Sequence, residues 1–131
     1  MKAHLDAIAA KLAVGYPVDV WAPEPGRTGQ RLVIEAPGWA SDPDSPIGET
    51  SGAFEVELRL RAVTGTPHGV AIMLAHAREV LPGVLTVAGR FCTIQWQRSE
   101  FIDLDLDTTD PRTNRHPAYG VDSYTLTSQP A

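Results

Sequence analysis

The stretch AFEVELRLRAV, residues 53–63, alternates apolar and charged side chains from Phe54 to Arg61. A period of two places the two kinds on opposite faces of a β-strand, so one face meets a core and the other meets water or a partner. Eleven residues make a ribbon of roughly 35 Å, which is long for a chain of 131 residues. Charges of both signs in a row can set the register between neighbouring subunits as well as solubilise a strand, so this face is a candidate partner interface. Its charged residues are Glu55, Glu57, Arg59 and Arg61.

Length and composition narrow the class of protein. The 131 residues suffice for one hydrophobic core, so we expect a single domain over residues 1–131. The net charge of −5, without a cluster of Lys or Arg, argues against tightly bound nucleic acid. The single cysteine, Cys92, excludes an internal disulfide, and its apolar context predicts a buried side chain. Without an apolar run of about 18 residues or a signal peptide, we expect an intracellular protein that does not enter the membrane.

Apolar side chains at helical spacing predict two helices. The first covers residues 2–13 and the second runs from Thr66 to Leu81. Thr66 supplies an N-cap and Pro67 a first-turn proline for the second helix. Because a helix of three turns is marginal alone, we expect both helices to pack on a sheet.

The remaining β-like stretches predict a mostly antiparallel sheet. Most connections are too short for a parallel crossover, and residues 18–21 and 31–36 are expected to form a hairpin with a wide turn. The sequence therefore predicts an α+β fold with two helices packed on the sheet. The expected strands are 18–21, 31–36, 53–63, 84–87, 91–97, 100–106 and 118–127.

Residues 37–52 form a predicted long flexible loop, rich in Pro, Gly, Ser and Asp. Structureless loops of this length are uncommon in compact domains and are usually functional or disordered. Trp39 and Ile47 are its only large apolar residues, and we interpret them as candidate partner contacts. The alternative is that Trp39 packs back onto its own domain.

The sequence contains only weak signals of a catalytic or metal site. Asp103, Asp105 and Asp107 alternate with leucines, which predicts three carboxylates on one strand face and leaves loose cation binding or a solvated face as alternatives. An EF-hand loop starting there would need glycine and glutamate where Thr108 and Asn114 stand. The four histidines lack zinc-ligand spacing, and no nucleophile or phosphate-loop signature is present. We therefore expect no cofactor, no metal and no enzymatic activity.

The end of the chain resembles a known family. The acidic segment IDLDLD (102–107) is followed by a turn and by HPAYGVDSYTL (116–126). This order of elements resembles the tail terminator proteins of long-tailed, non-contractile bacteriophages. Those proteins also open with a short helix, carry a strand pair and a mobile loop, and lay a helix on the sheet before a similar closing strand. In that family the positions of Tyr119 and Tyr124 belong to a packed strand, so we expect core rings with hydroxyls at the rim.

The resemblance implies a structural virion protein that forms a homo-oligomeric ring, usually a hexamer. Such a ring binds the open end of the tail tube, stops addition of tube protein and presents the surface that joins the head. Its partners would be its own copies, the tube protein and a head-completion or connector protein, with DNA only in passage through the lumen. It would assemble in the host cytoplasm and end in the virion, at the head-proximal end of the tail.

Under this interpretation Asp103, Asp105 and Asp107 line the lumen, where negative charge repels phosphates. Two alternatives stay open. One is another head–tail connector or tail-completion protein. The other is a ligand-binding or enzymatic α+β domain with Trp96, Tyr124 and carboxylates around a pocket.

Overall fold

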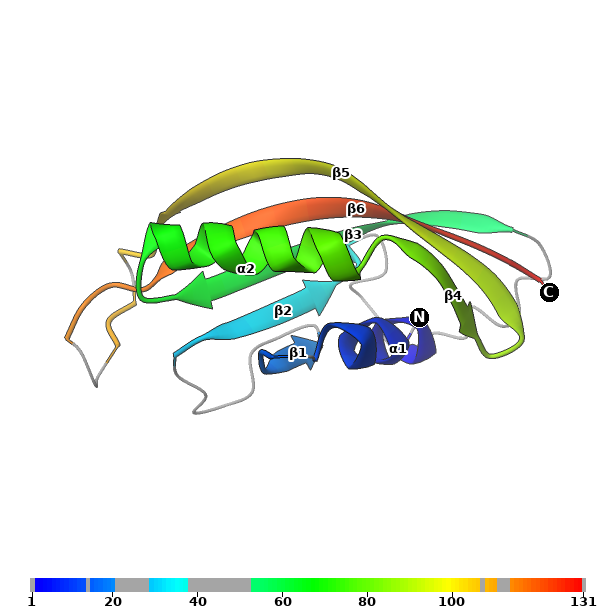
Figure 1. Ribbon diagram of the computed structural model, residues 1–131, viewed down its shortest axis with the longest axis horizontal. Helices are drawn as coiled ribbons and strands as arrows, with labels where there is room; N and C mark the ends of the chain where they lie inside the picture. The colour runs from blue at the N-terminus through cyan, green and yellow to red at the C-terminus, as the bar shows by residue number, and fades with distance from the viewer. Residues whose placement is uncertain are drawn as a thin grey trace.

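The computed structural model describes residues 2–13, 15–20, 29–37, 53–106, 108–110 and 114–130, without the side chain of Phe101. These residues form an α+β domain with a mostly antiparallel sheet and two helices, as predicted (Figure 1). Trp39, Ile47 and Asp107 lie outside the described residues, as does the predicted loop apart from Pro37. The elements are α1 (Lys2–Leu12), β1 (Val18–Val20), β2 (Arg31–Glu35), β3 (Phe54–Thr64), α2 (Pro67–Val80), β4 (Gly83–Val87), β5 (Arg90–Leu104) and β6 (Ala118–Pro130).

The two middle strands of the sheet, β3 and β6, come from distant parts of the chain. The strand order is β1-β2-β3-β6-β5-β4, and β3 pairs with β6 along its whole length, from Phe54 opposite Ser128 to Thr64 opposite Ala118. The predicted closing strand therefore lies in the middle of the sheet. β6 thus connects β1, β2 and β3 on one side with β5 and β4 on the other.

The hairpin predicted for residues 18–21 and 31–36 is wrong, because β1 and β2 pair in parallel, with Val18 opposite Leu32. The connection between β1 and β2 can span roughly 33 Å when extended, far more than the length of a three-residue strand. The chain therefore has room to return to the starting end of the next strand. A wide connection does not impose antiparallel pairing as a tight turn does.

The two strands predicted over residues 91–97 and 100–106 are one strand, β5, which ends at Leu104. Its pairing with β6 shifts register between Trp96 and Arg98 and again between Ser99 and Ile102. Bulges of this kind take up extra residues without ending the ladder. They also interrupt the period of two, which explains why the sequence resembles two strands.

The hydrophobic core lies between one face of the sheet and both helices. α2 is capped as predicted, because Oγ1 of Thr66 accepts a hydrogen bond from the N–H of Gly69 at 3.0 Å. Full burial of a large apolar side chain is worth about 1.5–3 kcal/mol, so packing rather than propensity holds these helices. Core residues include Leu32, Ile34, Val56, Leu58, Leu60, Tyr124 and Leu126 of the sheet, and Leu5, Ile8, Leu12, Val70, Met73, Leu74 and Ala77 of the helices.

A buried polar cluster joins α1 to the C-terminal strand. Oγ of Ser128 accepts a hydrogen bond from Nε of Arg90 at 2.8 Å and lies 3.1 Å from Nε2 of His4. Burial lowers the pKa of His4, and nearby positive charges, Arg90 among them, lower it further. A neutral imidazole can accept at Nε2, so the hydroxyl of Ser128 can donate to it. Cys92 is buried beside this cluster, as predicted.

Replacing Gly120 by Ala is expected to destabilise the fold. A Cβ at this position would lie 2.7 Å from Cγ1 of Val70 and 3.0 Å from Cγ1 of Ile102. Val70 is a fully buried β-branched residue on a helix, so its methyl groups cannot easily turn away. We expect Gly120→Ala to lower the free energy of unfolding by about 1–3 kcal/mol, measured by urea denaturation.

Gly65→Ala is the matched control, because a Cβ at Gly65 meets nothing within 4 Å. This variant should keep or slightly raise the midpoint of urea denaturation, since alanine restricts the unfolded chain more than glycine does. Equal midpoints for the two variants would contradict the close packing of α2 on β6.

Candidate functional site on the open face of the sheet

One face of the sheet is covered by no described helix. Both helices pack on the face that carries Leu58 and Leu60, so the charged side chains of β3 lie on the opposite face. We call this opposite face the open face. The predicted interface residues Glu55, Glu57, Arg59 and Arg61 all belong to it, as the alternation requires.

Part of the charge on the open face is paired within the chain. Glu57 lies 3.7 Å from Nε of Arg59 and 3.9 Å from Nη2 of Arg98, and Arg98 also lies 3.6 Å from Glu100. Exposed pairs at such distances contribute little to stability. In the described part of the chain, Arg61 makes no ion pair. Its charge is therefore available to a partner or ligand.

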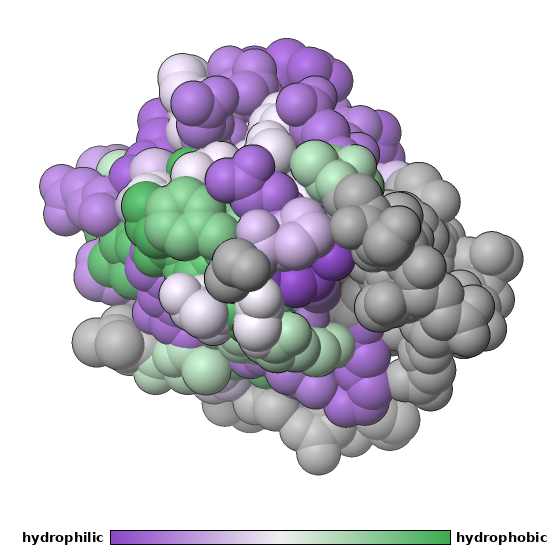
Figure 2. Space-filling view, turned by 90° about the vertical axis from the view of Figure 1, so that its right-hand side faces the viewer, coloured by the Kyte–Doolittle hydropathy of each residue, from purple (hydrophilic) through white to green (hydrophobic). Residues whose placement is uncertain are grey.

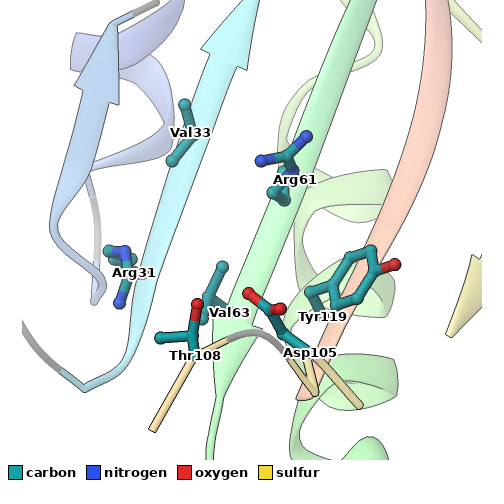
Figure 3. Close-up of a pocket in the computed structure, with 7 residues that line it drawn as sticks. All are labelled: Arg31, Val33, Arg61, Val63, Asp105, Thr108 and Tyr119. Carbon is teal, nitrogen blue, oxygen red and sulfur yellow. The ribbon is translucent and has the colours of Figure 1, made fainter. Parts of the chain in front are cut away.

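A cavity of about 370 Å³ opens on this face (Figure 3). Its base is a checkerboard on β2 and β3, where Arg31 pairs with Val63 and Val33 pairs with Arg61. The two guanidinium groups thus enter one cavity from diagonal positions. The other lining residues are Asp105, Thr108 and Tyr119.

The cavity is rich in hydrogen-bond donors. Nη1 of Arg31 donates to the carbonyl oxygen of Gly29 at 2.9 Å, while its Nε is buried without a partner in the described residues. Two guanidinium groups and the hydroxyls of Thr108 and Tyr119 suit an oxyanion, and Asp105 is the one carboxylate among the described lining residues.

A second cavity of about 240 Å³ adjoins the first and shares Arg61 and Tyr119 with it. Its other lining residues are Glu35, Arg59, Glu100 and Val121, so it carries both signs of charge. Together the two cavities give the open face a hollowed surface, lined by charged and hydroxyl-bearing side chains and by Val33, Val63 and Val121. Such a surface fits charged side chains of a partner or a small charged ligand.

Two carboxylates of the predicted acidic row, Asp103 and Asp105, are among the described residues. β5 ends at Leu104, so only Asp103 stands on the strand, where it is exposed and pairs with Tyr119. Asp105 follows the strand and lines the larger cavity beside two arginines. The N–H of Asp105 still donates to the carbonyl oxygen of Pro117 at 2.8 Å, and a turn follows in which the N–H of Thr108 donates to the carbonyl oxygen of Asp105 at 3.3 Å. The strand predicted to reach Leu106 is therefore shorter, whereas the shared face of all three carboxylates stays a prediction, because Asp107 lies outside the described residues.

The two tyrosines of the closing strand have different places. Tyr119 is half-buried and lines both cavities instead of the core. Tyr124 is completely buried, and its hydroxyl has no hydrogen-bond partner in the described part of the chain, so this hydroxyl is not at a rim. Burial raises the pKa of Tyr124, and nearby Asp122 raises it further. Neither cavity is lined by Trp96 or Tyr124, the pair expected around a ligand pocket.

A buried carboxylate on the helix-covered face was not predicted. Asp122 is completely buried, and its oxygens accept hydrogen bonds from Arg78 Nε at 2.7 Å and from Trp96 Nε1 at 3.2 Å. Ser99 Oγ also donates to it at 2.5 Å, and the Arg78 guanidinium lies 5.0 Å from the Trp96 ring centroid. The alternation of β6 could have revealed it, because Asp122 stands two residues before the buried Tyr124 and therefore faces the core as well.

The other titratable groups do not gather into a site. In the described ranges, no group of three His, Cys, Asp or Glu side chains is arranged to hold a metal ion. Nδ1 of His116 lies 2.8 Å from the carbonyl oxygen of Thr108, and Nε2 of His76 is buried without a partner among the described residues. No helix in the described part is long and apolar enough to cross a membrane.

Comparison with models of known protein families finds no match for this chain. Comparison with curated proteins likewise finds no significant relative.

Replacing Arg78 by Gln is expected to destabilise the fold by about 3 kcal/mol, because the buried carboxylate of Asp122 loses its counter-charge. The measurement is the free energy of unfolding from chemical denaturation. Arg98→Gln is the matched control, since Arg98 is exposed and its pairs span 3.6 and 3.9 Å. We expect the control to cost less than about 1 kcal/mol, and equal losses would contradict a structural role for Asp122.

Proposed function

We propose that this chain is the subunit of a homo-oligomeric ring, of six copies, that terminates the tail tube of a long-tailed, non-contractile bacteriophage. The ring binds the tube end, ends its polymerisation and offers the surface for head joining. Its partners are further copies of the chain, the tube protein and a head-completion protein. It acts in the virion and assembles in the host cytoplasm.

The observation that carries this proposal is the division of the sheet into two unlike faces. One face is covered by both helices, and the other presents charged residues of both signs on a central strand of eleven residues. A polar face of this kind suits contact between folded subunits, because mixed charges specify partner and register while keeping the free subunit soluble. The motif that resembles tail terminators forms β6, in the middle of this sheet.

The mechanism is occlusion. A helical tube grows because each subunit offers the same contact to the next one. A ring that matches the tube on one side and lacks the tube contact on the other side ends that repetition. The chain therefore needs complementary surfaces and no catalytic group.

A second candidate function is binding of a small oxyanion in the larger cavity. The observation that favours it is the donor-rich lining, with Arg31 and Arg61 facing one space of about 370 Å³. A ligand-binding domain would bind its ligand as a monomer or dimer, whereas a terminator forms larger assemblies. Light scattering with and without added phosphate or citrate separates the two functions.

Removal of this gene from the phage is expected to give tails of irregular, extended length without heads. Tube polymerisation would then lack its stop and the head would lack its docking surface. Tail lengths are measured on electron micrographs of lysates, with the gene supplied from a plasmid as the control. Uniform tails with heads attached would refute the proposed function.

Neutralising the acidic row by Asp103→Asn, Asp105→Asn and Asp107→Asn is expected to leave assembly intact and to slow DNA ejection. Negative charge on a lumen wall repels phosphates and keeps DNA from adhering. Ejection is followed by release of DNA from purified virions in the presence of receptor. Glu79→Gln serves as the control for loss of charge elsewhere, because Glu79 is exposed on α2 and lines neither cavity. Unchanged ejection by the triple variant would exclude the lumen role.

A further inference from the structure

The polar cluster around Ser128 is buried at the end of the sheet where α1 begins. His4 of α1 is 4% exposed, Arg90 at the start of β5 is 9% exposed, and Ser128 near the end of β6 is completely buried. Figure 2 looks onto this end of the molecule and shows apolar surface gathered there beside hydrophilic surface. A new charge at this depth would be costly, because burial disfavours the charged form of a titratable side chain.

One hydroxyl group joins the side chains of this cluster. Oγ of Ser128 accepts a hydrogen bond from Nε of Arg90 at 2.8 Å, and the carbonyl oxygen of Ser128 accepts one from Nη2 of Arg90 at 3.2 Å. The thiol of Cys92 donates to the same Oγ at 3.5 Å. Because these donors are directed at the hydroxyl oxygen, its proton is left for Nε2 of His4 at 3.1 Å. A neutral imidazole that carries its proton on Nδ1 can accept it.

Protonation of His4 would disrupt this arrangement. A proton on Nε2 turns the acceptor into a further donor directed at Oγ of Ser128, beside the donors of Arg90 and Cys92, and a hydroxyl oxygen has only two lone pairs. The hydroxyl proton would lose its acceptor, and a positive imidazolium would lie close to the guanidinium of Arg90 in a buried site. Both changes disfavour the packed position of α1.

The charged groups around His4 add to this cost. Burial lowers the pKa of His4, and the positive charges of the terminal amino group and of Arg90 on β5 lower it further. β3 contributes the ring of Phe54, whose centroid lies 5.6 Å from that of His4, while Glu55 lies on the open face. β6 contributes the neutral Ser128, and β4 contains no titratable side chain. In the described part of the chain, His4 makes no ion pair with a carboxylate.

α1 is the element that loss of this contact can release. It has 11 residues, and a helix of this length is marginal without packing. Its other buried side chains are Leu5, Ile8 and Leu12, so His4 is the one polar group among them. The pairing of β3 with β6 does not depend on α1, and helix ends open more readily than central strands. The start of α1 can therefore detach while the sheet persists.

We infer that the contact between His4 and Ser128 is an acid-sensitive latch, which holds the start of α1 on β6 at neutral pH and opens when the imidazole takes up a proton. The inference does not depend on the proposed function. Because the pKa of His4 in the folded chain lies below its ordinary value of 6.5, the opened chain binds the proton more readily as the pH falls. The packed position of α1 is therefore fully stable above about pH 6.5 and loses up to about tenfold in its equilibrium constant per unit of pH below it.

The accessibility of Cys92 tests the latch in the full chain. Cys92 is the only cysteine of the sequence, and it is completely buried beside the latch. Its rate of reaction with dithiodipyridine is measured from about pH 7.5 to about pH 5.5, relative to the urea-unfolded chain at the same pH, which corrects for titration of the thiol itself. We expect a constant relative rate above about pH 6.5 and a rise of up to about tenfold over the next pH unit. Amide hydrogen exchange should rise in α1 and not in β3 or β6, and an equal rise in these strands would overturn the latch.

His4→Gln is the decisive variant, because a glutamine amide oxygen can accept the hydroxyl proton of Ser128 but does not titrate. The relative rate of this variant should not change with pH. His68→Gln is the matched control, since His68 is exposed on α2 and the wild-type pH dependence should persist in this variant. A rise in His4→Gln equal to that of the wild type, or no rise in the wild type, would overturn the latch.

An NMR titration of the imidazole resonances of the wild type tests the latch without any variant. We expect His4 to carry its proton on Nδ1 at neutral pH and to titrate below about pH 6.5. An imidazole of His4 that is protonated on Nε2 at neutral pH, or that titrates at or above this value, would overturn the inference even if His4→Gln fails to fold.

Discussion

One buried negative charge constrains how α2 and β5 lie on the sheet. Asp122 is completely buried in the middle of the sheet, and its hydrogen-bond donors come from α2 through Arg78 and from β5 through Trp96 and Ser99. A buried carboxylate without partners costs several kcal/mol, so α2 and β5 must stay where their donors reach it. These hydrogen bonds act together with the apolar packing of α2, on the face of the sheet that both helices cover.

Elements whose pattern is local were predictable from the sequence. The alternation of β3 and the Thr66–Pro67 start of α2 depend only on neighbours in the chain, and both are confirmed. The parallel pairing of β1 with β2 depends on a contact between strands whose connection does not dictate their direction. The bulges of β5 break the period of two, so a single strand is divided in the sequence pattern.

In the candidate site, too, the features set by a local sequence pattern were predictable and those set by contacts between distant strands were not. The charged side of β3 was predictable, because alternation alone assigns its face. The larger cavity was not, since it brings Arg31, Asp105 and Tyr119 together from three separate segments. Pairing register decides which side chains share such a space, and register between distant strands is a property of the whole sheet. Asp122 lies between these cases, because its position on the core-facing set of β6 was visible while its partners were not.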